Sequence, residues 1–275
     1  MDADELLEAN DQFFVGNFEK SAELADVTAG GEALAARAAL AAGKTEKIRG
    51  LQHSEIPSLR AIAVFHVFAN APAQRAAALT KLEEISRSTR DPISLYLHGC
   101  ALAILGRSIE ALNLEIGKSE DLHALKIQIA LLAERSDLAA KISGDLARAD
   151  SSAAKFGQGL AAIANGRADE AYLCFNDLGN QFDAEENPGI AGARGAANLC
   201  RRLWSEALED SELVLKKFPG HQECLVNAAC AAYRMGRAAD AGNFLRSLPG
   251  DHPLISRGPK SVEEACSRFA NSVRP

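Results

Sequence analysis

The residues Gly43-Lys44-Thr45 are the first candidate for chemistry in this sequence, because they match the end of a phosphate-binding loop. In such a loop the lysine reaches the phosphates and the hydroxyl binds Mg²⁺. The motif also needs a glycine five residues before Gly43, where Ala38 stands, and a preceding strand, which the alanine-rich sequence does not predict. We therefore interpret these residues as a helix corner and keep a nucleotide-using enzyme as the weakest alternative.

The other reactive side chains do not predict a catalytic or metal site. The six histidines are scattered along the chain, and the six cysteines contain no C-x-x-C pair. Cys224 and Cys230 are six residues apart, which places them on different sides of a helix and argues against a zinc site. No G-x-S-x-G turn is present for a serine nucleophile. The sequence thus predicts a non-enzyme without cofactor, metal or small-molecule substrate, whose cysteines are buried free thiols in a reducing compartment.

The overall composition favours a helical protein of the cytoplasm. The chain has 275 residues, of which 47% are hydrophobic and only 5% aromatic, and alanine is very common. Its formal net charge of -7 argues against nucleic-acid binding, which needs a basic face. The acidic start MDADELLEAN lacks the pattern of a signal peptide, and no apolar run approaches the length that spans a bilayer.

A short pattern recurs along the chain and predicts the corner between two helices. GRSIEA, GRADEA and GRAADA begin at Gly106, Gly166 and Gly236, and an alanine stands five residues after each glycine. Glycine is typical of a helix end, and an acidic residue near the following alanine is typical of a helix start. Weaker versions of the pattern extend the series of corner residues to Gly16, Gly43, Asn70, Glu134 and Arg202.

A second position supports the same register. Seven residues before the corners stand mostly small residues, with one exception, Ile127: Ala9, Ala36, Ala63, Gly99, Ile127, Gly159, Gly195 and Ala229. Small residues on both helices of a pair let the two backbones approach closely. Corners 27 to 36 residues apart with this pattern are typical of tetratricopeptide repeats. We predict an all-α, tetratricopeptide-like alpha solenoid of about eight helix hairpins, and keep a generic alanine-rich helical bundle as the alternative.

The domain prediction is one solenoid over residues 1–275. A last amphipathic helix is expected at 261–272, because Ser261 and Glu264 match a capping box. This helix would cover the apolar face at the end of the array. Loops are expected at 28–32, 86–92 and 182–189.

The first helix of each pair should line the concave surface, where partners of such solenoids bind. Positions three, four, six and ten before each corner are expected to face it, and the side chains there are mostly apolar. The predicted partner-binding residues are Phe13, Leu40, Val67, Tyr96, Cys100, Phe156, Leu160, Ile163, Leu199 and Tyr233. An equally simple interpretation of any one of them is helix-packing core. Only Asn227 and Arg234 fit a clamp for an acidic tail.

Several stretches together resemble the epsilon subunit of coatomer. They are DELLEANDQFFVGNFEKSAELA (4–25), ISRSTRDPISLYLHGCALAILGRSIEALNL (85–114), DEAYLCFNDLGNQF (169–182), LWSEALEDSELVLKKFPGHQECLVNAACAAYRMGR (203–237) and LPGDHPLI (248–255). The resemblance spans nearly the whole chain and lies in the order and unequal spacing of the motifs. The high alanine content and the segment 115–137 depart from the commoner form.

The resemblance implies a structural subunit of the COPI vesicle coat. Such a solenoid would curl around the C-terminal region of the coatomer alpha subunit, in Golgi-to-endoplasmic-reticulum and intra-Golgi transport. It would be cytoplasmic, and peripheral on Golgi membranes and COPI vesicles through the coat. The alternative function is a tetratricopeptide adaptor or cochaperone that binds a peptide tail of another partner.

Overall fold

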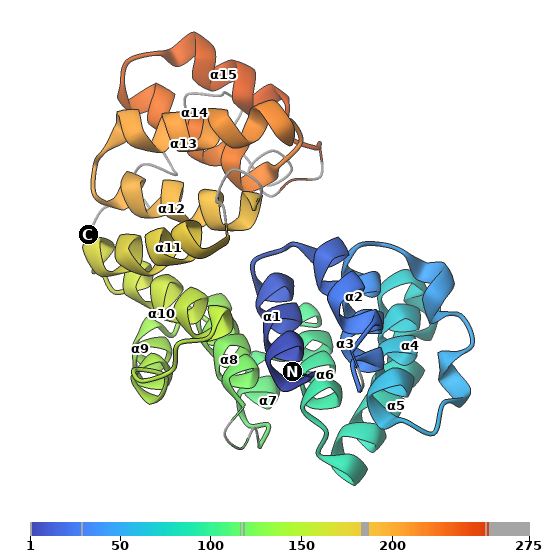
Figure 1. Ribbon diagram of the computed structural model, residues 1–275. Coiled ribbons are helices and arrows are strands. Elements are labelled where there is room, and N and C mark those ends of the chain that lie inside the picture. Colours follow the sequence, from blue (N-terminus) through green and yellow to red (C-terminus); the bar gives the residue numbers. More distant parts are fainter. Residues whose placement is uncertain are drawn as a thin grey trace. The chain divides into compact units, whose positions relative to one another are not determined.

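The computed structural model describes residues 2–28, 30–115, 117, 119–182, 187–250 and 252, and throughout this part of the chain the regular structure is helical (Figure 1). The α-helices are α1 (Asp2–Phe14), α2 (Phe18–Asp26), α3 (Glu32–Ala41), α4 (Pro57–Asn70), α5 (Arg75–Thr89), α6 (Pro92–Ile104), α7 (Ser108–Leu112), α8 (Glu120–Leu132), α9 (Ser136–Asp145), α10 (Ser152–Ala164), α11 (Ala168–Phe182), α12 (Pro188–Cys200), α13 (Trp204–Lys217), α14 (Gln222–Arg234) and α15 (Ala238–Arg246). Three short 3₁₀ helices accompany them: η1 (Thr45–Ile48), η2 (Leu51–His53) and η3 (Pro72–Gln74). None of these helices is long and apolar enough to span a lipid bilayer.

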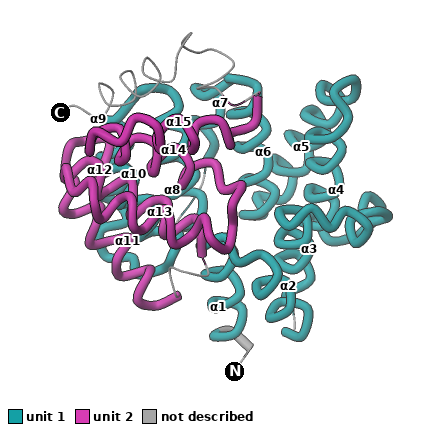
Figure 2. Tube along the Cα trace, turned by 90° about the horizontal axis from the view of Figure 1, so that it is seen from above, with its two compact units in different colours: residues 1–161 teal, residues 162–275 magenta. Residues whose placement is uncertain are grey.

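The chain divides into two compact units, residues 1–161 and residues 162–275 (Figure 2). In each unit, successive helices pack against their neighbours as antiparallel pairs. This arrangement confirms the predicted all-α solenoid of helix hairpins. The number of repeats and the assignment of the whole chain to one domain stay predictions, and the expected helix at 261–272 lies outside the described residues.

The predicted corners coincide with the left-handed residues of the backbone. Seven of the eight corner residues have a positive φ between 58° and 90°, at Gly16, Gly43, Gly106, Glu134, Gly166, Arg202 and Gly236. At each, the N–H of the next residue donates to the carbonyl five residues earlier in the chain, as from Arg107 to Leu102 at 2.9 Å. This bond satisfies a carbonyl that the helix end leaves unpaired. The exception is Asn70, which Ala71 and the 3₁₀ turn at Pro72 follow.

The small residues on either side of each corner are packed as the repeat predicts. The alanines five residues after the corners are at most 1% exposed: Ala111, Ala139, Ala171, Ala207 and Ala241. At Gly99, a Cβ atom would lie only 3.0 Å from the Leu125 side chain. At Gly195 it would lie 3.3 Å from the Asn227 amide and 3.4 Å from the Ser211 hydroxyl. The small positions therefore allow the close approach of neighbouring helices.

Two segments differ from the predicted regular pattern. After Gly43 the second helix of the pair is replaced by η1 and η2, which Gly50 separates with a φ of 98°. The loop expected at 86–92 is shorter, because α5 continues to Thr89. Asp91 then caps α6 by accepting a hydrogen bond from the Ser94 N–H at 2.7 Å. A strong local cap thus lets one helix follow another with almost no loop.

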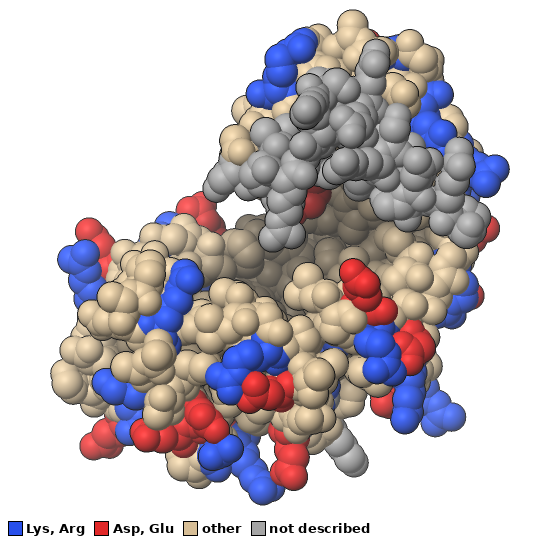
Figure 3. Space-filling view, turned by 180° about the vertical axis from the view of Figure 1, so that it is seen from behind, with Lys and Arg blue, Asp and Glu red and all other residues tan. Residues whose placement is uncertain are grey.

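Charged pairs mark the corners on the surface. The arginine that follows a corner pairs with a nearby acidic residue, in Arg107–Glu110, Arg135–Asp137, Arg167–Glu170 and Arg237–Asp240. In the lower part of Figure 3, lysine and arginine groups accordingly lie beside aspartate and glutamate. Exposed pairs of this kind each contribute at most about 1 kcal/mol to stability. The acids also lie in the first turn of a helix, where the helix dipole favours negative charge.

Candidate partner-binding surface

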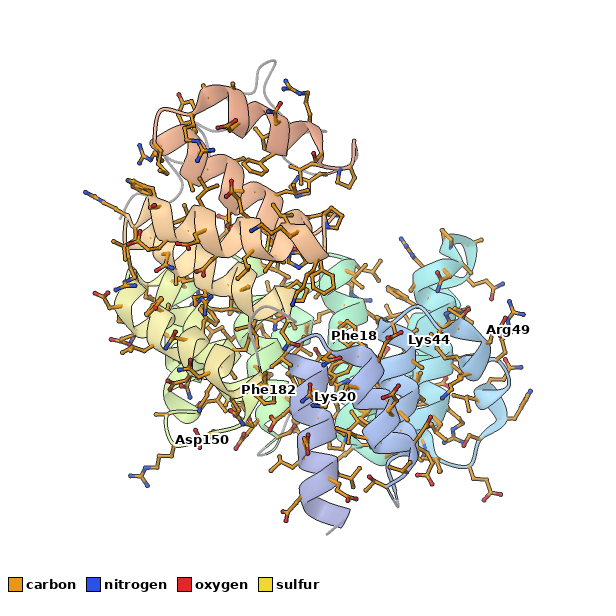
Figure 4. The ribbon with its side chains drawn as sticks, turned by 45° about the horizontal axis from the view of Figure 1, so that its top comes forward. Phe18, Lys20, Lys44, Arg49, Asp150 and Phe182 are labelled. Carbon is orange, nitrogen blue, oxygen red and sulfur yellow. The ribbon has the colours of Figure 1, made fainter. Side chains whose placement is uncertain are left out.

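The Gly43-Lys44-Thr45 segment forms a corner and not a phosphate-binding loop. The helix α3 precedes it, Gly43 has a φ of 75°, and Thr45 begins η1. The Lys44 ammonium pairs with the Glu19 carboxylate on α2 at 2.8 Å, at the surface of the unit (Figure 4). The backbone N–H of Lys44 donates to the Ala39 carbonyl. Both groups that would bind phosphate therefore already have partners within the fold.

Two histidines and two cysteines serve helix packing: His98, His221, Cys100 and Cys224. His98 is buried, its Nδ1 lies 2.9 Å from the Ser86 hydroxyl, and the removal of water lowers its pKa. His221 caps α14 by accepting from the Cys224 N–H. These two residues stand three apart, at metal-ligand spacing, and the sequence-based prediction overlooked them. Burial raises the pKa of the Cys100 and Cys224 thiols to about 12, which makes both poor nucleophiles. No group of three His, Cys, Asp or Glu among the described residues is placed to hold a metal ion.

The predicted surface positions separate into two stripes on the first helices. Residues four before seven of the eight corners are buried, which corrects the prediction for this position: Gln12, Ala39, Leu102, Ala130, Ala162, Asn198 and Ala232. His66, four before the corner Asn70, is half-buried. The helical period places position four on one side of the packed position seven and positions three, six and ten on the other side, and the neighbouring helices cover the side of position four. Positions three, six and ten form the other stripe.

Most of the predicted partner-binding residues are half-buried on that second stripe. These are Phe13, Leu40, Val67, Tyr96, Cys100, Phe156, Leu160, Ile163 and Tyr233. Leu199 differs, because its side chain is only 2% exposed and packs in a core with Leu208 and Leu225. For Leu199 the alternative interpretation as helix-packing core is therefore the right one. The role of the others in binding stays a prediction.

Two of these residues, Phe13 and Tyr96, meet around Arg37, which the sequence pattern did not single out. The guanidinium carbon lies 3.9 Å from the centre of the Phe13 ring, 4.3 Å from that of Tyr96 and 5.1 Å from that of Phe14. Its Nη1 pairs with the Asp121 carboxylate at 3.3 Å. Arg37 is only 3% exposed, and its Nε and Nη2 have no hydrogen-bond partner among the described residues. The sequence could have indicated Arg37, because it stands six residues before the corner Gly43. The predicted partner-binding residue Cys100 stands at the same position, six before the corner Gly106.

The Arg37 cluster joins helices that are far apart in sequence. The Asn10 amide of α1 donates to Asp121 of α8 at 3.2 Å, and the Ser152 N–H of α10 donates to Asp11 at 2.9 Å. Figure 1 shows α1 beside α6 and α8. First helices of non-consecutive pairs can meet only on the inner side of a curved array. Phe13 and Tyr96, which were predicted to bind a partner, thus contact other helices of unit 1.

A pocket of about 450 Å³ lies between α4 and α5. We call it the α4–α5 pocket. Val64 and Val67 of α4 and Ile85 of α5 give it apolar walls. Arg60 of α4 and Lys81 of α5 also line it, and Gln52 of η2 borders it. Arg60, Val64 and Val67 stand ten, six and three before the corner Asn70, so the pocket opens onto the predicted stripe.

The two residues that fit a clamp for an acidic tail are used in packing within unit 2. The Asn227 amide is 4% exposed and donates to the Gly192 carbonyl at 2.8 Å. The Arg234 guanidinium lies over the Trp204 ring, 5.2 Å from its centre. Asn227 therefore cannot reach a peptide carboxylate without breaking a buried hydrogen bond.

The fold places the chain in the class of α-solenoid proteins, whose stacked helix pairs form extended concave binding surfaces. A search of the curated proteins found no match. The family model described as coatomer epsilon subunit matches residues 2–269, which is nearly the whole chain. The chain belongs to the coatomer epsilon subunit family, a family of structural subunits of the COPI vesicle coat.

Proposed function

We propose that this chain binds and stabilises the C-terminal region of the coatomer alpha subunit, as a non-catalytic part of the COPI coat. The observation that carries the proposal is the family match over residues 2–269. The coat would act in Golgi-to-endoplasmic-reticulum retrograde and intra-Golgi transport. The chain would be cytoplasmic and would reach Golgi membranes and vesicles through its partner.

The half-buried stripe supports binding of a largely apolar partner segment. Leu40, Val67, Leu160, Ile163 and Tyr233 leave part of their apolar surface in contact with water. Burial of that surface by a partner stabilises a complex by about 25 cal/mol per Å² of apolar area, before the costs of association. A surface of this kind suits an enduring partner better than a transient charged ligand.

The first experiment is co-expression of the full chain with the C-terminal region of coatomer alpha. We expect a single species with one copy of each chain by size-exclusion chromatography with light scattering. The variant Leu160→Asp should abolish the complex, because it places a charge on the apolar stripe. The matched control is Leu173→Asp, at a side chain that is 60% exposed on a second helix. Two separate monodisperse peaks for the wild-type chains would contradict the proposal.

The alternative function is an adaptor or cochaperone for an acidic C-terminal peptide. It predicts micromolar binding that Arg234→Ala abolishes. The packing of Asn227 against Gly192 disfavours it, because a clamp needs polar side chains that reach the solvent. A fluorescence titration with an acidic C-terminal peptide distinguishes the two functions, and the coat proposal predicts no binding that depends on Arg234.

A further inference from the structure

The α4–α5 pocket combines an apolar wall with two cations that have no ion pair among the described residues. Most arginines of unit 1 pair with an acid, as at Arg87, Arg107 and Arg135. Within the part of the chain that the structure describes, Arg60 and Lys81 form no such pair, although both line the same 450 Å³ pocket. Glu84 also lines it and is exposed. The pocket therefore carries one more positive than negative charge, in a chain whose net charge is -7.

Arg60 has an unsatisfied donor at this place. Its Nε is buried and has no hydrogen-bond partner among the described residues. A buried donor without a partner is unfavourable, so a partner that lets the Arg60 side chain turn toward an acceptor stabilises the complex. The guanidinium is half-buried, which reduces the screening of its charge by water. A carboxylate is the acceptor that a guanidinium and a nearby ammonium favour most.

We propose that the α4–α5 pocket receives a partner segment in which a carboxylate lies next to an aliphatic side chain. The aliphatic group would pack on Val64, Val67 and Ile85. The Arg60 side chain would turn toward the carboxylate and pair with it through the guanidinium, and the Lys81 ammonium would pair with the same carboxylate. This inference rests on the proposed function and gives the chemistry of the segment that coatomer alpha would supply. Its support is the charge complementarity between an acidic segment and these two cations.

The test compares three double variants of the full chain, each in a complex with the C-terminal region of coatomer alpha. Arg60→Gln/Lys81→Gln should weaken binding about five- to tenfold, as expected for the loss of two partly exposed charge pairs. Arg60→Glu/Lys81→Glu should weaken it further, because it opposes the carboxylate with two like charges. Lys141→Glu/Arg148→Glu is the control with the same change in net charge, at exposed positions away from the pocket. Lys81→Gln alone changes only an exposed side chain. Weaker binding by this variant therefore cannot come from a folding defect caused by the Arg60 substitution.

A second measurement does not depend on coatomer alpha. The probe is a fluorescein-labelled octapeptide of alternating leucine and glutamate, with leucine–glutamine and leucine–lysine peptides as controls. We expect the glutamate peptide to bind about five- to tenfold more tightly than the glutamine peptide, and Arg60→Gln/Lys81→Gln to remove the difference. Equal binding of the three peptides, or wild-type affinity of both Arg60/Lys81 double variants for coatomer alpha, would overturn the inference. If the wild-type chain does not bind coatomer alpha, the proposed function fails, and the peptides still decide this inference.

Discussion

Replacement of Asp121 by asparagine tests whether the Arg37 cluster holds unit 1 together. The substitution keeps the shape of the side chain but removes the charge that faces the buried guanidinium. The two groups are 3.3 Å apart, and at an effective dielectric constant of 20 their direct attraction is about 5 kcal/mol. Part of this attraction only offsets the cost of removing both charges from water.

The expected cost of Asp121→Asn is about 2–3 kcal/mol, below the 3–5 kcal/mol of a fully buried pair. Two features reduce it. The Asp121 side chain is 23% exposed, and Arg37 keeps its contacts with the Phe13, Phe14 and Tyr96 rings. The double variant Arg37→Met/Asp121→Asn should be more stable than Asp121→Asn alone, because no unpaired charge then remains inside.

Urea unfolding of the full chain at pH 7, monitored by circular dichroism, measures the differences in the free energy of unfolding between the variants and the wild type. Hydrogen exchange locates them: protection should fall in α1 and α8, with α14 as the internal reference. The reasoning is refuted if Asp121→Asn unfolds within about 0.5 kcal/mol of the wild type, the range of ordinary surface substitutions. It is also refuted if the double variant is less stable than the single one.

Three further predictions follow from the corners, the close approaches and the buried histidine. Glu134→Gly should raise the free energy of unfolding by about 1 kcal/mol, since a left-handed φ strains any residue with a Cβ atom, and Glu134→Ala should give no such gain. Gly99→Val should lower the free energy of unfolding by about 1–3 kcal/mol through contact with Leu125, whereas Gly144→Ala in open space should not lower it. Burial lowers the pKa of His98, so the unfolded chain binds more protons, and the urea midpoint should fall from pH 7.5 to pH 5.5. His98→Gln should reduce this fall without removing it, because the pKa of His221 is lowered too; an unchanged pH dependence would contradict the assignment.

The sequence predicts the corners well because their requirements are local. A left-handed residue, a small residue seven before it and an alanine five after it all lie within one helix pair, so a repeat makes them visible. The Arg37 cluster could not be predicted in the same way. Its ion pair joins residues 84 positions apart, and only the curvature of the array brings them together.

The prediction of surface residues was limited because the sequence pattern did not fix how each helix is rotated about its own axis. Positions three and four before a corner differ by one residue, yet one lies on the half-buried stripe and the other in the packed face, as Val67 and Leu102 show. Leu199 departs even from this rule, because Leu208 and Leu225 cover it. The extent to which neighbouring helices cover a stripe depends on tertiary packing, which a single sequence does not encode position by position.

The contact of α1 with α8 and α10 gives unit 1 a different tolerance to change from that of a linear array. In an open solenoid each repeat touches only its neighbours, so a helix pair can be gained or lost at little cost to the rest. In unit 1, Asn10 bonds to a residue 111 positions away, and Asp11 to one 141 positions away. Insertion or deletion of a pair between them would move both bonding partners out of reach at once. The contacts of α1 with α8 and α10 therefore fix the number of helix pairs in unit 1.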